Sequence, residues 1–389
     1  MIKKILILTC ISLALLVPQN AKAAQITNDQ VVDEYKNWTI HFNREVAFDD
    51  LSKQGIVVTD SKGNKVDVQL ELGKDNKSII VEYPTWGYLL DEKYQLTINN
   101  KVHDTDNKCI KQPVCINFKV EPESKDAVIF KDKAFQDSVK NYIKKPNGEI
   151  LKSDVEKLTR FDTFGINAEY ANIENISGID KFTNLSELYL DNNKISDISP
   201  LEQLINLENI ALDNTKVSDI NPLSSLANLK SISLNFTQVS DITPLKQLGD
   251  LKSVDLCGTK IEDISALEDL TGLESLALNN TKISDITPLK KLYNLEVLDL
   301  SNTKVSDISA LNELKNLVEL DLTNSPIKNL NALKGLDNLE SLRLDNTQVS
   351  DIDTLKELKN LKELIVSGLS DSEQKILENA LPNCRILGL

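Results

Sequence analysis

A repeat of 22 residues constrains the fold of this chain more than any other feature. The unit reads L-x-x-L-x-L-x-x-[N/T]-x-[I/V]-x-D-I-x-[P/A]-L-x-x-L-x-N and recurs without insertion or deletion. Eight units begin at Leu185, Leu207, Leu229, Leu251, Leu273, Leu295, Leu317 and Leu339, and a ninth opens at Leu361. Such a period predicts a solenoid, because a single unit cannot bury its apolar side chains without a neighbour.

The unit itself predicts a short strand followed by a helical return. Positions 4 and 6, such as Leu188 and Leu190, are expected to point inward, so positions 3, 5 and 7 point outward from a parallel sheet. The polar residue at position 9, Asn193 in the first unit, should also turn inward and bond the backbone of a neighbouring turn. Residues 199–202, Ser-Pro-Leu-Glu, suggest an N-cap, a proline at the first helical position and a capping-box glutamate.

This unit resembles the leucine-rich repeat in the 22-residue form of internalin-like surface proteins. The resemblance covers residues 128 to 389, including a helical cap. It implies recognition of another protein through the concave sheet, often at a host or neighbouring-cell surface. An immunoglobulin-like module usually follows the repeats in that family but precedes them here, and no LPxTG-like motif precedes Leu389. These departures favour secreted protein binding over host-cell adhesion.

The residues before the repeats predict a small antiparallel sandwich of about seven strands. Alternating segments include 38–42, 66–72, 94–98 and 116–120. Trp38 and the step Phe42-Asn43-Arg44-Glu45-Val46 resemble the bacterial surface-layer type of immunoglobulin-like domain. The expected fold is therefore an α/β leucine-rich-repeat solenoid preceded by an all-β immunoglobulin-like sandwich. Its expected divisions are a signal peptide (1–23), sandwich (24–121), linker (122–127), helical cap (128–166), repeats (167–360, the first degenerate) and C-terminal cap (361–389).

The N-terminus predicts export. Lys3 and Lys4 precede a 13-residue apolar run, and Ala21-Lys22-Ala23 places small residues as signal peptidase requires. The run is shorter than the roughly 20 residues needed to span a bilayer, so we expect cleavage after Ala23, a secreted or surface-associated protein and no membrane insertion. Cleavage removes three lysines and no acid, which leaves (44 − 3) − 59 = −18. An acidic protein of this kind disfavours nucleic acid and favours a partner protein with a basic surface.

Chemistry-bearing motifs are sparse, so we expect a binding protein rather than an enzyme. The two histidines, His41 and His103, both precede the repeats, and no zinc spacing or phosphate-binding glycine loop occurs. No cofactor or metal is expected. An aspartate recurs at position 13, from Asp197 onward, and is expected to accept a backbone N–H in its own turn, with calcium binding as the alternative.

The candidate ligand-binding residues lie on the concave positions. Acidic residues dominate them, Arg343 is the single base, and the aromatics Tyr189 and Phe236 are candidate anchors. Phe236 interrupts a run of asparagines at position 8 and could instead pack on its neighbour. A glycan or cell-wall binder is the alternative function. The full candidate set is Glu187, Tyr189, Asp213, Phe236, Asp255, Asp299, Glu319, Asp321 and Arg343.

Four cysteines follow the expected cleavage site, too few for a disulfide scaffold. Cys109 and Cys115 bracket a turn-forming stretch that could bring two strand ends within bridging distance. Export makes a disulfide between them our prediction, with two free thiols as the alternative.

Overall fold

The computed structural model describes residues 11–13, 25–163 and 172–387. The predicted signal peptide lies outside these residues except for 11–13, as do 167–171 of the degenerate repeat and 388–389 of the C-terminal cap. The chain divides into two compact units, Met1–Lys152 and Ser153–Leu389.

The first unit is all-β apart from short helices, as expected for a sandwich. One sheet has the order β1-β3-β7-β6 and the other the order β2-β9-β8-β4-β5, and both mix parallel and antiparallel pairs. Its elements are β1 (Ile11–Leu13), β2 (Gln25–Val32), β3 (Trp38–Phe42), α1 (Asp50–Gln54), β4 (Ile56–Asp60), β5 (Lys65–Val66), β6 (Leu70–Leu72), β7 (Ser78–Val81), β8 (Lys93–Ile98), β9 (Val114–Val120) and α2 (Lys133–Tyr142). Helix α3 (Lys152–Val155) begins at the last residue of the first unit and lies mostly in the second.

The two sheets enclose an aromatic core. Trp38 on β3 is fully buried, and its ring centroid lies 5.0 Å from that of Phe118 on β9. Tyr94 on β8 stacks on the same phenylalanine at 5.4 Å. Inward and outward residues alternate along β3 and β9, as period-2 strands require. The predicted strand pattern is thus confirmed.

Helix α2 belongs to the first unit. The sequence expectation placed residues 128–166 with the repeats as a cap, whereas the first unit extends to Lys152. The physical reason is Lys140, which is 1% exposed and donates to Glu34 Oε2 at 3.0 Å and to Tyr35 Oη at 2.9 Å. An amphipathic period identifies the buried side of a helix, but it does not identify what covers that side.

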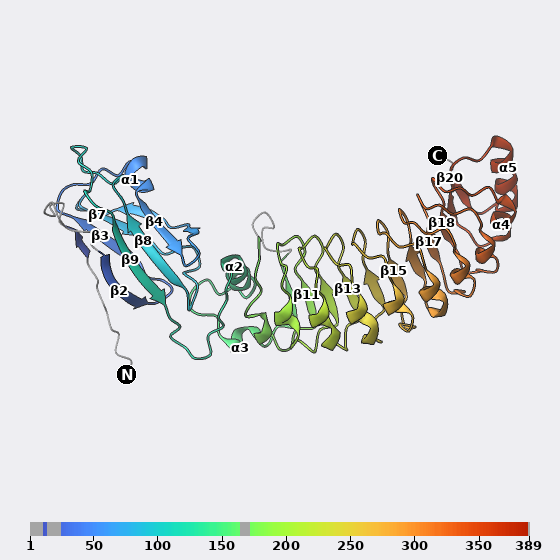
Figure 1. Cartoon of the computed structure of the whole chain (residues 1–389), viewed down its shortest axis with the longest axis horizontal. Helices are drawn as coiled ribbons and strands as arrows, with labels where there is room; N and C mark the ends of the chain where they lie inside the picture. Colours follow the sequence, from blue (N-terminus) through green and yellow to red (C-terminus); the bar gives the residue numbers. More distant parts are fainter. Residues whose placement is uncertain (1–10, 14–24, 164–171, 388–389) are drawn as a thin grey trace. The chain divides into compact units, whose positions relative to one another are not determined.

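The second unit is a solenoid built on an eleven-stranded parallel sheet, and the predicted repeat fold is confirmed (Figure 1). Adjacent strands pair in register at the spacing of the repeat, for example Leu188 with Ile210. The strands are β10 (Arg160–Asp162), β11 (Glu187–Tyr189), β12 (Asn209–Ala211), β13 (Ser231–Ser233), β14 (Ser253–Asp255), β15 (Ser275–Ala277), β16 (Val297–Asp299), β17 (Glu319–Asp321), β18 (Ser341–Arg343), β19 (Glu363–Ile365) and β20 (Arg385–Leu387).

Each unit returns by a short 3-10 helix. These helices are η1 (Ile179–Lys181), η2 (Ser199–Leu201), η3 (Asn221–Ser225), η4 (Thr243–Gln247), η5 (Ser265–Leu267), η6 (Thr287–Lys291), η7 (Ser309–Leu311) and η8 (Asn331–Leu333). The eighth unit is the exception, because it returns by the α-helix α4 (Ile352–Glu357). In the C-terminal cap, α5 (Asp371–Ala380) begins with a capping box of Ser370 and Glu373.

The expected N-cap at Ser199 is wrong. Ser199 lies inside η2, whose N-cap residue is Ile198 and makes no side-chain cap bond. Asp197 supplies the acceptor instead, because its Oδ1 receives the Ser199 N–H at 2.8 Å. The same bond recurs at position 13 of the following units, such as Asp241 to Thr243 at 2.8 Å. The expectation that these aspartates serve their own turns is confirmed.

Polar side chains recur at two further positions of the repeat, and their hydrogen bonds lie within a unit or join it to the preceding one. At position 9, Asn193 Oδ1 accepts from Ile173 N of the preceding unit at 3.0 Å, as expected, and so joins two units. Thr215 in the next unit is also buried, but its hydroxyl donates to Leu212 O of its own unit at 2.7 Å. At position 22 an asparagine amide bonds the preceding unit, as Asn228 does to Ile205 O at 2.8 Å. These bonds satisfy backbone and side-chain groups that the interior would otherwise leave unpaired.

The first strand of the sheet was not predicted. Phe161 on β10 pairs with Leu188 on β11, at a separation of 27 residues instead of 22. The irregular spacing hides this strand from a search for a fixed period. Its consequence is that Arg160 and Asp162 join the outward face of the sheet.

Candidate binding face

The outward side chains of β10–β20, at positions 3, 5 and 7 of each unit, form one continuous surface that we call the strand face. Its central strands carry small residues: Ala211, Ser231, Ser233, Ser253, Ser275 and Ala277. Most side chains on these strands are half-buried, because neighbouring rungs cover their flanks. The strand face is therefore shallow at its centre, and a partner could approach the sheet closely there.

The N-terminal end of the strand face is already occupied by internal contacts. Arg160 bonds Asp162 Oδ2 at 3.0 Å and Glu187 Oε2 at 2.5 Å. Its guanidinium also lies 4.5 Å from the ring centroid of Tyr189, a cation–π distance. Tyr189 Oη contacts Glu187 at 3.4 Å. Two predicted binding residues, Glu187 and Tyr189, are thus engaged by an arginine that the sequence reasoning missed.

The C-terminal end contains the predicted base Arg343, which lies 3.9 Å from Asp321. Arg385 on β20 approaches Glu363 at 3.8 Å. Arginines therefore compensate the acidic residues at both ends of the strand face. No ion pair involves Asp213, Asp255 or Asp299 among the described residues.

Most of the predicted acidic cluster also bonds the backbone. Asp299 Oδ1 accepts from Ser301 N, and Asp321 Oδ1 from Thr323 N, both at 2.9 Å. Asp213 Oδ1 accepts from Asn235 N at 2.8 Å. The sequence analysis placed these aspartates among the candidate binding residues, but their backbone bonds also give them a structural role. Glu319, which is exposed, has no such bond among the described contacts.

The arrangement raises the proton affinity of part of the face. Burial raises the pKa of Asp255, against the lowering effect of its bond from Asn235. Burial likewise raises the pKa of Asp299, and the neighbouring carboxylates of Asp321 and Asp255 add to the shift. Asp255 and Asp299 therefore become protonated at a higher pH than an isolated aspartate.

Phe236 occupies an unusual backbone conformation. Position 8 has a positive φ in every unit from Asn192 to Gly368, and asparagine or glycine meets this requirement elsewhere. Phe236 has a φ of 56° and its residue surface is 53% exposed. Its ring lies against Gly258, where an added Cβ would be 2.6 Å from Phe236 Cδ1. The structure thus shows the packing of Phe236 on its neighbour, and the anchor role stays a prediction.

The predicted disulfide is wrong in the structure, because Cys109 and Cys115 are both free. Cys109 is exposed and forms an isolated backbone β-bridge with His103, whereas Cys115 lies within β9 and pairs with Thr97 on β8. Thr97 Oγ1 is 3.7 Å from Cys115 Sγ. The two cysteines are thus held against different backbone partners.

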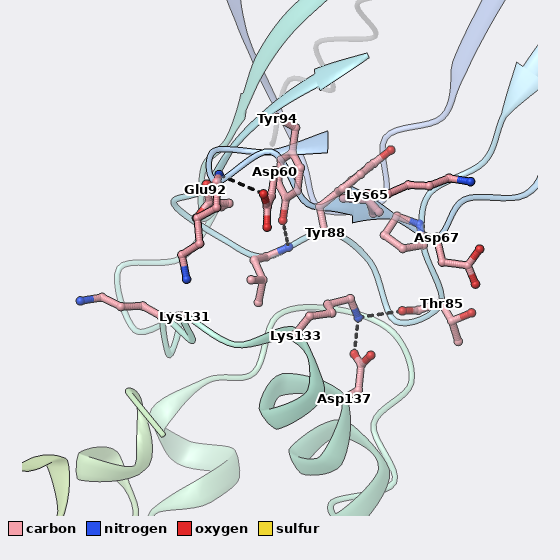
Figure 2. A pocket seen from close by; sticks show the side chains of 14 residues that line it. Asp60, Lys65, Asp67, Thr85, Tyr88, Glu92, Tyr94, Lys131, Lys133 and Asp137 are labelled. Carbon is pink, nitrogen blue, oxygen red and sulfur yellow. Dashed lines mark hydrogen bonds and ion pairs between the residues drawn. The ribbon is translucent and has the colours of Figure 1, made fainter. Parts of the chain in front are cut away.

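The first unit contains a separate pocket of about 320 Å³ (Figure 2). Its floor is apolar and includes Leu89 and Tyr94, whose hydroxyl accepts from Leu89 N at 3.0 Å. Four lysines and four carboxylates surround it: Lys62, Lys65, Lys131, Lys133, Asp60, Asp67, Glu92 and Asp137. Burial raises the pKa of Asp137 to about 6, while its ion pair with Lys133 opposes the shift. The balanced charges give no preference for a ligand of either sign.

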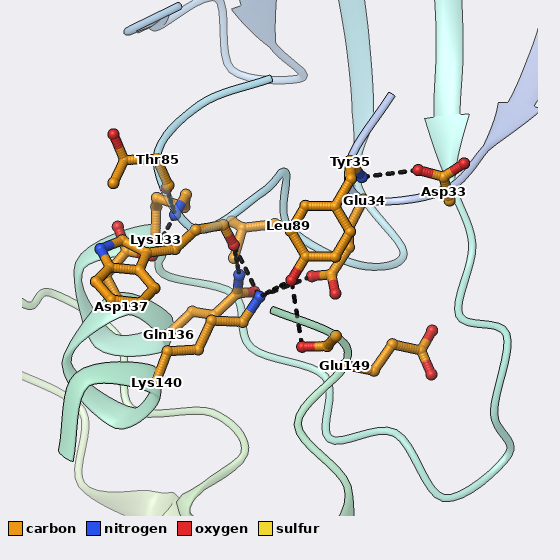
Figure 3. A network of polar contacts seen from close by, with 12 residues as sticks. Asp33, Glu34, Tyr35, Thr85, Leu89, Lys133, Gln136, Asp137, Lys140 and Glu149 are labelled. Carbon is orange, nitrogen blue, oxygen red and sulfur yellow. Dashed lines mark hydrogen bonds and ion pairs between the residues drawn. The ribbon is translucent and has the colours of Figure 1, made fainter. Parts of the chain in front are cut away.

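Beside this pocket, a polar network fixes α2 to the sandwich (Figure 3). Lys140 Nζ reaches Glu34, Tyr35 and the Trp86 carbonyl, the last at 2.8 Å. Burial raises the pKa of Glu34, although the Lys140 charge lowers it. All polar members of the network are satisfied by one another except Glu34 Oε1. The network is structural, since it joins elements of one unit.

Across residues 11–13, 25–163 and 172–387, no group of three or more His, Cys, Asp or Glu side chains is placed to hold a metal ion. Within the same part of the chain, no helix combines the length and apolarity needed to cross a membrane.

Comparisons with known proteins agree with this geometry. The family model described as leucine rich repeats (2 copies) matches residues 250–291 and 293–335. No curated protein sequence matches the chain. An internalin, inlF, of Listeria monocytogenes shares 26% identity with a TM-score of 0.55, covering 66% of this chain and 82% of its own. Internalin C2 of Listeria monocytogenes shares 32% identity with a TM-score of 0.51, covering 55% of this chain and 95% of its own. The chain therefore belongs to the leucine-rich-repeat proteins of the internalin type.

Proposed function

We propose that this protein is an exported binding module that recognises a partner protein through the strand face. The observation that carries the proposal is the charge distribution of β10–β20. Arginines compensate the carboxylates at both ends, and Asp213, Asp255 and Asp299 have no ion pair among the described residues. A basic protein surface would complement this centre, and the small side chains around it allow close approach.

The likeness to internalins supports a protein-interaction role rather than catalysis. The acidic charge disfavours nucleic acid, and the strand face offers a partner a rigid surface without any cofactor. Two exposed glutamates provide a matched pair for testing the face. Glu319 lies on β17, and Glu313 lies on the loop before that strand.

The test is a selection of phage-displayed random peptides against residues 24–389, followed by affinity measurement on the enriched peptides. We expect basic peptides whose binding weakens with Glu319→Lys and with Asp299→Asn, and does not change with Glu313→Lys. Asp299→Asn keeps an oxygen acceptor for Ser301 N, so it removes charge without removing that bond. Peptides whose affinity is unchanged by every strand-face substitution would refute the proposal. Binding to a glycan array that Glu319→Lys abolishes would favour the glycan alternative.

We also propose that the N-terminal unit is an immunoglobulin-like domain of the surface-layer type. The support is its two mixed sheets and the buried Trp38 on β3 against Phe118 on β9. Export with cleavage between Ala23 and Ala24 completes the proposal. N-terminal sequencing of protein from culture medium is expected to begin at Ala24, and an intact Met1 would contradict it.

A further inference from the structure

The strongest departure from the repeat lies at position 8, where the backbone is left-handed in all nine units. Six units place asparagine there, and two place glycine. Both residue types tolerate a positive φ, whereas a bulky side chain brings its Cβ against the carbonyl oxygen. Phe236, with a φ of 56°, is the exception. The backbone bond of Phe236 N to Cys257 O, 2.8 Å, matches that of Asn214 N to Asn235 O, 2.8 Å, so the backbone geometry does not require a phenylalanine.

Phe236 also interrupts a ladder of side-chain hydrogen bonds. Asn214 Nδ2 donates to Asn192 Oδ1 at 3.2 Å, and Asn346 donates to Asn324 Oδ1 at 2.8 Å. An aromatic ring cannot continue this series. The next unit has Gly258, where an asparagine Cβ would lie 2.6 Å from the ring, so the ladder is lost at two successive units.

Burial of the ring offsets only part of the cost of the positive φ and of the interrupted hydrogen bonds. The ring rests on Gly258, yet 53% of the residue surface remains exposed. Local strain that no internal contact requires is a recognised mark of a functional position. Aromatic residues, phenylalanine included, are enriched at protein interfaces, where a few residues carry most of the binding energy.

The surroundings of Phe236 indicate the chemistry of the partner. The adjacent Asn235 Nδ2 donates to Asp213 Oδ2 at 3.1 Å and to Asp255 Oδ2 at 2.7 Å, so both carboxylates are held by the residue that precedes Phe236. Neither carboxylate has a cationic partner among the described residues. The adjoining strands carry the small side chains of Ser231 and Ser253, which do not obstruct a partner.

We propose that Phe236 anchors a docking site whose occupant is a protein segment with an apolar recess for the ring, flanked by a lysine or arginine that meets Asp213 and Asp255. The proposal rests on the proposed function of the strand face and locates its centre at β12–β14. It separates this region from the two ends, where Arg160 and Arg343 already neutralise the surface.

The experiment uses the peptides enriched from the phage-displayed library and the variant Phe236→Asn, which restores the usual residue of position 8. Tyr293→Asn is the matched control, because Tyr293 is 54% exposed, lies in the loop between η6 and β16 and has no positive φ. We expect enriched peptides that combine an apolar cluster with lysine or arginine. Their affinity should fall about 30-fold or more with Phe236→Asn, the scale of an interface anchor, and stay unchanged with Tyr293→Asn.

The proposal would be overturned if every enriched peptide bound the wild type and Phe236→Asn with equal affinity. If peptides lose binding with Glu319→Lys but not with Phe236→Asn, the proposed function stands and this inference fails. Urea unfolding gives a second measurement. Phe236→Asn loses the contact of the ring with Gly258, but it also relieves the strain of a bulky residue at a φ of 56°. If the ring is an anchor placed at a cost to the fold, the two effects offset and the unfolding midpoint is unchanged or raised, whereas a clear fall would identify the ring as a packing residue.

Discussion

The contact between Phe236 and Gly258 makes a quantitative prediction about stability. Replacing Gly258 with asparagine suits the backbone, because its φ is 66° and six other units place asparagine at this position. The new Cβ would lie 2.6 Å from Phe236 Cδ1 and 2.8 Å from Cε1. The ring must therefore leave its present place. In a Phe236→Asn background there is no ring to displace.

The burial of Phe236 sets the size of the effect. A fully covered aromatic side chain buries roughly 150–250 Å². Phe236 is 53% exposed, so displacing its ring exposes at most about 100 Å² of buried surface. At about 25 cal/mol per Å², an upper estimate for burial on folding, this corresponds to about 2 kcal/mol. Gly258→Asn should thus cost about 1–2 kcal/mol in the wild type and within about 0.5 kcal/mol of zero in the Phe236→Asn background, which gives a coupling energy of about 1–2 kcal/mol.

The assay is a double-mutant cycle measured by urea unfolding. Circular dichroism is the suitable probe, because both tryptophans lie in the first unit and do not report on the solenoid. Gly368→Asn provides the control, since Gly368 occupies position 8 with a φ of 79° and has open space around it. Equal costs of Gly258→Asn in the two backgrounds would show that the ring does not rest on Gly258 and would refute the reasoning.

Three further predictions concern other contacts. Lys140→Met leaves the Glu34 carboxylate buried without its cation and should destabilise the first unit by about 3–5 kcal/mol, as measured by tryptophan fluorescence, whereas the exposed Lys125→Met should have no effect. Asp197→Ala should lower the urea midpoint and Glu202→Ala should not. Bonds from Ser199 lower the pKa of Asp197, so its contribution is present above the unfolded pKa of about 3.9 and is lost as pH falls through the folded pKa; an equal deficit at pH 7 and pH 2 would contradict this. Thiol titration of residues 24–389, unfolded without reductant, should find four free thiols, and two would restore the Cys109–Cys115 bridge.

The repeat could be predicted almost residue by residue because its period determines both pairing and burial. Each leucine or isoleucine at positions 4 and 6 has the same neighbours one unit away, so a single pattern predicts the whole sheet. The same logic failed at β10, where 27 residues separate Phe161 from Leu188. Missing that strand meant missing Arg160, which compensates Glu187 and covers Tyr189.

The remaining errors have a common origin, which is that sequence spacing does not identify a contact partner. The helical cap expected over residues 128–166 does contain helix α2, but the buried Lys140 attaches this helix to the sandwich. Cys109 and Cys115 are close in sequence and yet pair with different backbone neighbours. A serine before a proline resembles an N-cap, although the acceptor comes from Asp197, two residues earlier.

The strand face shows how structural and functional residues can be separated in a repeat protein. A carboxylate that recurs in the repeat and accepts from a backbone N–H has a structural role, as Asp321 does by accepting from Thr323 N. A residue that breaks the repeat and leaves the local geometry less well satisfied is not explained by the fold, since selection for stability alone would restore the usual residue. Phe236 meets that criterion through its φ, the interrupted asparagine ladder and its exposure. Acidic composition is the reason for proposing the strand face, and the departure from the repeat is the reason for proposing that its docking site lies next to Phe236.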